Sequence, residues 1–128
     1  MGYAEAEMVE LHGWSNVSAG PLTFDTLKVI QSELKPWQEH NFPGRPSWQP
    51  LLGVQEEVGE LSHAFLKRAQ NIRGSYEDHT ADIEDAVADI CIFLCDFCNA
   101  ENIDLAAVLL DTWRDTVAKR DWRPEALA

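Results

Sequence analysis

Apolar residues recur at intervals of three and four along most of this chain, and this spacing is the strongest constraint on its fold. Side chains spaced in this way share one face of an α-helix. The pattern predicts four helices, covering about residues 23–40, 48–70, 81–100 and 104–120. No alternation typical of β-strands competes with it. We therefore expect an all-α fold of the four-helix-bundle type.

The segments between these helices are rich in proline, glycine and polar residues. Thr23 or Asp25 can cap the first helix, and Pro36 is expected to bend it. Residues 41–50 hold three prolines and a glycine, so they predict a loop, with Ser47 as the N-cap of the second helix. Residues 1–22 show no sustained periodicity and are interpreted as a flexible arm, which leaves residues 23–128 as a single domain.

The chain is strongly acidic, with 22 Asp and Glu against 10 Lys and Arg and a formal net charge of -12. Such a charge disfavours binding to nucleic acid polymers or to anionic membranes. The longest apolar runs fall far short of the roughly 20 residues that a membrane span needs, and no signal-peptide pattern opens the chain. We therefore expect a cytoplasmic protein. The three cysteines share the third predicted helix and are interpreted as core residues rather than disulfide or metal ligands.

The second predicted helix carries glutamates beside its apolar face. On a helical wheel, Glu57 falls about 60° from Val54 at the centre of that face. Glu60 lies further round, and Glu56 is turned furthest outward. A lone surface carboxylate has no reason to border the core in this way.

The third predicted helix carries a matching acidic stripe. With Asp89 as the reference, the other acids of the stripe lie within about 40° of it on the wheel. They adjoin the apolar sector of the same helix, and they are Asp82, Asp85 and Asp96.

Stacked carboxylates of this kind repel one another, more strongly when they are partly buried. A divalent cation offsets the repulsion directly, and Mg²⁺ prefers oxygen ligands such as those that two facing helices can supply. The alternative interpretation is a solvated acidic helix face. Two matched stripes that both border apolar faces favour the metal site.

The run Glu56-Glu57-x-x-Glu60, followed by a second acidic helix, resembles the all-α nucleoside triphosphate pyrophosphohydrolases of the MazG type. The resemblance covers about residues 24–122, and its main segments are Leu-Leu-Gly-Val-Gln-Glu-Glu-Val-Gly-Glu-Leu at 51–61 and Asp-Ala-Val-Ala-Asp-Ile-Cys-Ile-Phe-Leu at 85–94. It implies a MazG-like bundle that assembles as a homo-oligomer. The implied activity is magnesium-dependent hydrolysis of (deoxy)nucleoside triphosphates between the α and β phosphates, in a role such as cleansing of the nucleotide pool.

Carried over by motif, the resemblance implies that Glu57, Glu60 and Asp89 hold two or more Mg²⁺ ions, for which Mn²⁺ can substitute. Glu56 is expected to be the catalytic residue that orients the attacking water or accepts its proton; binding of a further metal is the alternative.

This chain departs from the family pattern at one position. The family commonly has Glu-x-x-Asp on the second acidic helix, but the residue three before Asp89 is Ala86. Asp85, about 40° from Asp89 on the wheel, is the expected replacement ligand.

Basic side chains are candidates for phosphate binding. Lys67 lies two turns beyond Glu60 and within about 20° of it on the wheel, so it is a candidate phosphate ligand. A surface lysine that covers apolar groups is the alternative. Lys119 and Arg120 resemble the family's C-terminal phosphate-contacting segment, although bases also suit the C-terminal end of a helix.

Two aromatic residues and one acid are candidates for nucleoside binding. Phe42 and Trp48 lie in and after the loop before the first acidic helix, a region that lines the nucleoside pocket in the family. Asp96 occupies a position where family members often place a polar residue near the nucleoside.

Three hypotheses therefore stand. The first is a nucleoside triphosphate pyrophosphohydrolase that works as a homodimer or homotetramer. The second is the related phosphoribosyl-ATP pyrophosphohydrolase. The third is a non-enzymatic, acidic helical interaction module that only binds divalent ions.

Overall fold

The structure is a computed structural model that describes residues 25–117, 119 and 120. Within this part of the chain it consists of four α-helices and one π-helical turn. The all-α class is thus confirmed for the described residues, and the arm expected over residues 1–22 lies outside them. The elements are α2 (Asp25–Asn41), α3 (Trp48–Gln70), α4 (Tyr76–Ala100), α5 (Leu105–Thr112) and η1 (Trp113–Val117).

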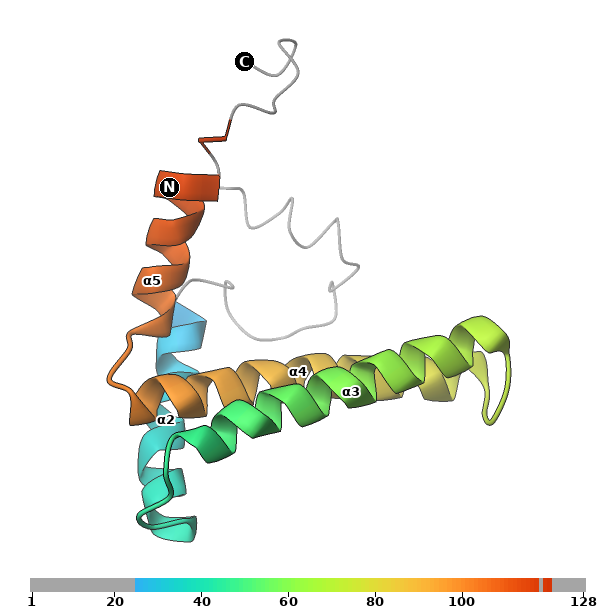
Figure 1. The fold of residues 1–128 in the computed structure, drawn as a ribbon, viewed down its shortest axis with the longest axis horizontal. Helices are drawn as coiled ribbons and strands as arrows, with labels where there is room; N and C mark the ends of the chain where they lie inside the picture. The colour runs from blue at the N-terminus through green and yellow to red at the C-terminus, as the bar shows by residue number, and fades with distance from the viewer. Residues whose placement is uncertain (1–24, 118, 121–128) are drawn as a thin grey trace.

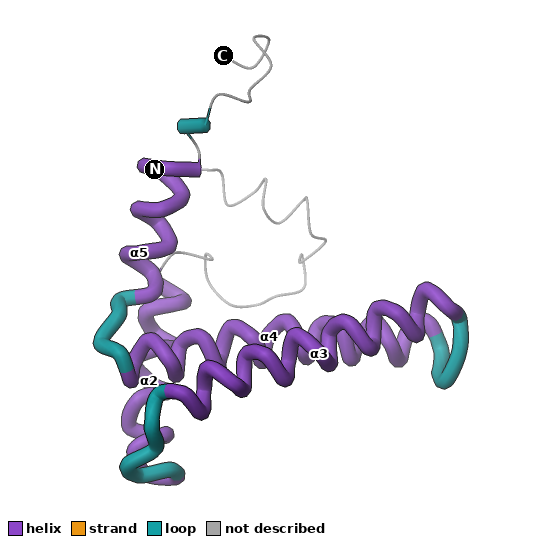
Figure 2. Tube along the Cα trace, viewed as in Figure 1, coloured by secondary structure: helices purple, strands orange, loops and turns teal. Residues whose placement is uncertain are grey.

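Helices α3 and α4 form a long antiparallel hairpin, the dominant feature of the fold (Figure 1). Helices α2 and α5 lie across one end of it, whereas the loop that joins α3 to α4 projects at the other end (Figure 2). Only α3 and α4 run side by side along their length. None of the described helices combines the length and apolar character of a membrane span.

The first two helix predictions are close to the observed boundaries. Helix α2 continues through Pro36 to Asn41, whose side-chain amide donates to the carbonyl of Trp37 at 2.7 Å. Helix α3 begins after Ser47, which occupies the N-cap position without a side-chain cap. Pro50 therefore lies in the first turn, where a missing N–H costs no intrahelical hydrogen bond.

Helix α4 begins five residues earlier than predicted because a capping box starts it. The Ser75 hydroxyl accepts from the Asp78 N–H at 3.0 Å, and the Asp78 carboxylate accepts from the Ser75 N–H at 3.4 Å. The hydrogen bonds from Ser75 hold the pKa of Asp78 below its usual value. This reciprocal pair satisfies two N–H groups at the helix start. The preceding α3 ends at Gln70, and its C-cap Asn71 is left-handed at φ 54°.

The fourth predicted helix is shorter than expected. Asp104 caps α5 as predicted, accepting from the Ala107 N–H at 3.1 Å. The α-helix ends at Thr112 and passes into the π-helical turn η1, so it stops well before Arg120.

A single glutamine joins the helices at the crossed end of the hairpin. The side-chain amide of Gln31, on α2, donates to the Ile103 carbonyl at 2.7 Å and accepts from the Leu105 N–H at 3.2 Å. Its backbone carbonyl accepts from the Asn99 side chain on α4 at 2.9 Å. These bonds satisfy polar groups in the loop between α4 and α5.

Small side chains make up the buried core. Cys95 and Cys98 are buried on α4, and burial raises the pKa of both thiols, which confirms them as core residues; Cys91 is exposed. The other buried hydrophobic side chains are Ala64, Ala86 and Ala106. Because these side chains are short, the helix backbones approach each other closely at the contacts.

Candidate carboxylate site on the helical hairpin

The register of α3 against α4 is set by one close contact. Gly53 is buried, and a Cβ atom at this position would lie 2.5 Å from two ring carbons of Phe93. The ring therefore occupies the space that any side chain at position 53 would need.

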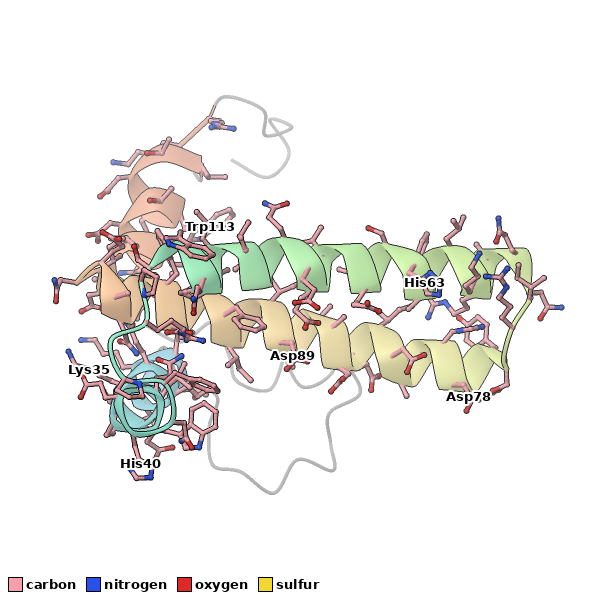
Figure 3. All side chains as sticks on the ribbon, turned by 60° about the horizontal axis from the view of Figure 1, so that its bottom comes forward. Lys35, His40, His63, Asp78, Asp89 and Trp113 are labelled. Carbon is pink, nitrogen blue, oxygen red and sulfur yellow. The ribbon has the colours of Figure 1, made fainter. Side chains whose placement is uncertain are left out.

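This register places Glu57 opposite Asp89. Because the helices are antiparallel, one turn forward from Gly53 reaches Glu57, and one turn back from Phe93 reaches Asp89. The antiparallel contact continues near the loop, where the Arg68 guanidinium donates to the Thr80 hydroxyl at 3.0 Å. Figure 3 shows Asp89 near the middle of the hairpin. Both Glu57 and Asp89 are half-buried.

Electrostatic repulsion is concentrated on Glu57. Partial desolvation raises the pKa of its carboxyl group, and the negative charges of four neighbouring carboxylates raise it further. Asp89 is the strongest of these neighbours, followed by Glu56, Glu60 and Asp85. The two acidic runs of the sequence therefore meet in space.

The remaining acids lie on one side of the hairpin. Measured from the buried Ala64 on α3 and Ala86 on α4, the acids Glu60, Asp85 and Asp89 are rotated in the same sense by about 40–100°. In antiparallel helices an equal sense of rotation from the contact line leads to the same side. Glu60 and Asp85 are exposed there, as is Glu56.

The expected ligand set is only partly assembled. Ala86, where the family pattern has glutamate, is 3% exposed and packs between the helices. Among the described residues, no three His, Cys, Asp or Glu side chains converge closely enough to hold a metal ion in the conformations observed. Of the expected ligands, Glu57 and Asp89 are half-buried opposite each other, whereas Glu60 and Asp85 are exposed to solvent beside them.

The three basic candidates do not contact this cluster. The Lys67 ammonium group lies 3.4 Å from the side-chain oxygen of Gln70, about 10 Å along α3 from Glu60. Lys119 pairs with Asp115 at 3.6 Å, and Arg120 is exposed. Figures 1 and 2 place residues 119 and 120 beyond α5, away from the hairpin.

Two of the three nucleoside candidates line a cavity at the crossed end of the hairpin. The cavity has a volume of about 490 Å³ and is bounded by the end of α2, the following loop and the end of α4. Phe42 and Asp96 line it, whereas Trp48 is exposed and lies outside its lining. Asp96 is buried and forms an ion pair with Arg45, which also lines the cavity.

The sequence interpretation missed Gly53, Arg45 and Gln31. Gly53 falls inside a helical pattern and Arg45 inside a proline-rich loop, and their partners lie 40 and 51 residues away. No local spacing reports such contacts. A glycine in the middle of a helix, which costs about 1 kcal/mol relative to alanine, was the one available signal.

Comparison with known proteins adds no family assignment: no protein-family model, curated protein or solved structure matches this chain.

Proposed function

We propose that this chain is a magnesium-dependent hydrolase of MazG-like fold that converts (deoxy)nucleoside triphosphates into the monophosphate and pyrophosphate. The observation that carries the proposal is Glu57, half-buried opposite Asp89, with its pKa raised by desolvation and by four surrounding carboxylates. Several carboxylates gathered around a partly desolvated carboxylate repel one another, which is unfavourable in the absence of a cation. A divalent cation removes the repulsion.

The donor set fits magnesium in its chemistry, because every candidate ligand is a carboxylate oxygen. Glu57 and Asp89 would hold the ion from two helices. Glu60 and Asp85 are exposed, so rotation of their side chains can complete the set. When bound, magnesium neutralises phosphate charge and lowers the pKa of a coordinated water.

Glu56 is the residue of this chain that acts in the reaction, and its side chain is exposed near Glu57. Its carboxylate orients the attacking water and accepts its proton. The water oxygen forms a new bond to a phosphorus atom. At the same time, the bond breaks between that phosphorus atom and the oxygen that bridges the α and β phosphates. The monophosphate and pyrophosphate are then released.

We further propose that the hairpin pairs with a second copy of the chain through the side opposite the acids. Val58 and Phe65 on α3 are 41% and 57% exposed, and Val87 on α4 is 47% exposed. All three are rotated by about 100–120° from the buried alanines, in the sense opposite to the acids. A contiguous apolar surface of this kind marks an association site. Two hairpins packed on it would form a four-helix bundle with the acids facing outward.

The test of the enzymatic proposal is pyrophosphate release from a panel of ribo- and deoxyribonucleoside triphosphates with Mg²⁺. We expect Glu57→Gln and Asp89→Asn to reduce release to background, and Glu56→Gln to reduce kcat by about 10²–10⁴-fold. Glu84→Gln is the matched control, because Glu84 is an exposed acid on the far side of α4. Full release by both ligand variants would overturn the site assignment.

The same measurements separate the alternative functions. A module that only binds ions would show magnesium-dependent thermal stabilisation that Glu57→Gln removes, without nucleotide turnover. A phosphoribosyl-ATP pyrophosphohydrolase would release pyrophosphate from phosphoribosyl-ATP in preference to ordinary nucleotides.

A further inference from the structure

The cavity at the crossed end of the hairpin contains a charged pair that the carboxylate site does not use. Arg45 and Asp96 form an ion pair, with only 18% and 8% of their side chains exposed. Phe42 flanks the pair, its ring centre 5.1 Å from the central carbon of the Arg45 guanidinium. Removing two charges from water is costly, so a pair that only tied the loop to α4 could be replaced by apolar residues without loss.

The guanidinium group retains donors for a ligand. Arginine carries five N–H donors, and a carboxylate can occupy at most two of them in a bidentate pair. Arg45 lines the cavity, as does the exposed ring of Phe42. The cavity therefore offers hydrogen-bond donors held in one plane beside an aromatic surface. A volume of about 490 Å³ is typical of small-molecule sites and accommodates a nucleoside.

The cavity lies on the same side of α4 as the carboxylates. Asp96 follows Asp89 by seven residues, which is about 10 Å along the helix and about 20° around it. A nucleotide whose phosphates lie at the carboxylates can therefore place its base at Asp96 and Arg45. This orientation rests on the proposed function, whereas the donor pattern of the cavity does not.

We propose that Arg45 is a specificity-determining residue that donates hydrogen bonds to a carbonyl oxygen of the nucleobase, with Asp96 as the positioning residue that holds the guanidinium in place. Arginine has no acceptor, so it can pair only with acceptor atoms of a base. Hypoxanthine, guanine, uracil and thymine present a carbonyl oxygen where adenine and cytosine present an amino group. An arginine that contacts this position of the base therefore favours oxo bases over amino bases.

The test uses neutral nucleosides and the full chain without metal. Binding of inosine, adenosine, uridine and cytidine is followed by NMR through the Arg45 Nε–Hε signal, and through backbone amides around the cavity in variants. We expect inosine to bind at least about tenfold more tightly than adenosine, because a bidentate arginine contact to O6 and N7 discriminates bases to this extent. Uridine should bind more tightly than cytidine through a single contact to O4. Arg45→Gln should reduce each ratio to near one.

Variants with matched changes keep the test independent of folding. Arg45→Gln leaves Asp96 buried without its partner, so Arg45→Gln/Asp96→Asn supplies a neutral pair that should fold and bind without preference. Asp96→Asn alone should lower the inosine-to-adenosine ratio, which a purely structural role would not change. Lys35→Gln removes a positive charge from the same cavity and should preserve the ratio.

Equal affinities for the paired nucleosides, a preference that survives Arg45→Gln, or no binding at millimolar concentrations would overturn the inference. Nucleosides need neither magnesium nor the acids, so Asp89→Asn should keep the preference. A base preference without pyrophosphate release would refute the proposed function alone. Pyrophosphate release without a base preference would refute this inference alone.

Discussion

Gly53 is the point at which α3 is pressed against the Phe93 ring, and Gly53→Ala is expected to destabilise the protein. The added Cβ would lie 2.5 Å from two ring carbons, so Phe93 or a helix backbone must shift. Overpacking of this kind costs about 1–3 kcal/mol. The better helix propensity of alanine offsets about 1 kcal/mol of that loss.

Gly59→Ala is the matched control on the same helix. A Cβ atom at Gly59 would have no neighbour within 4 Å, so the variant should gain about 0.5–1 kcal/mol from helix propensity alone. Propensity cancels in the comparison, which leaves a difference of about 1–3 kcal/mol from the close contact. At about 4 °C per kcal/mol, the two midpoints should differ by about 4–12 °C.

The assay is urea and thermal unfolding followed by far-UV circular dichroism, at one fixed protein concentration because association stabilises the folded state. Shortening the ring in Gly53→Ala/Phe93→Leu should recover part of the loss. Equal stabilities for Gly53→Ala and Gly59→Ala would refute the contact. The pairing of Glu57 with Asp89, which follows from the same register, would then fail as well.

Three further predictions concern charge, capping and association. The pKa of Glu57 in the folded protein is raised above its ordinary value of 4.5. Its contribution to the stability of the fold is therefore present below pH 4.5 and is lost as the pH rises through the folded-state pKa. Glu57→Gln should accordingly raise Tm in EDTA more at pH 7 than at pH 4, and an equal shift at both pH values would contradict this sign. Ser75→Ala removes half of the capping box and should cost about 1 kcal/mol in urea unfolding, whereas an unchanged midpoint would show that the box is not formed. Phe65→Glu places a charge on the apolar side of the hairpin and should abolish the proposed pairing, giving a monomer in analytical ultracentrifugation, whereas Lys67→Glu should leave the pairing intact. An unchanged mass for Phe65→Glu would exclude this surface as the interface.

Local patterns predicted the helices well because each depends on neighbouring residues. The apolar spacing located α2 and α3, and Asp104 marked the start of α5. The start of α4 also depends on neighbouring residues, because Ser75 and Asp78 form its capping box, but the apolar spacing does not report this box. The apolar spacing does not mark the end of α5, because it continues through a turn in which the backbone changes to π-helical geometry.

The wheel correctly indicated that the acids of α3 and α4 gather together, since each helix fixes the order of its own faces. It could not show which face meets the neighbouring helix. Val58 and Phe65 share the apolar face of α3 with Val54, yet they are 41% and 57% exposed in the single chain, and small residues form the contact instead. Trp37 and Trp113 are also exposed. Helix-to-helix register depends on contacts between distant residues, which periodicity does not encode.

Gln31 has a consequence for how the molecule opens. Its amide and backbone carbonyl connect α2 with the end of α4 and the start of α5, so neither of these two segments can separate from α2 without breaking hydrogen bonds to Gln31. The crossed end of the hairpin should therefore exchange its amide hydrogens as one cooperative unit. Within the described residues, the turn between Gln70 and Tyr76 has no such hydrogen bond to α2 or α5, so we expect it to open independently of the crossed end. We therefore expect amide exchange to be graded along the hairpin, slowest at the crossed end beside the cavity and fastest at the turn, with the carboxylates midway between the two.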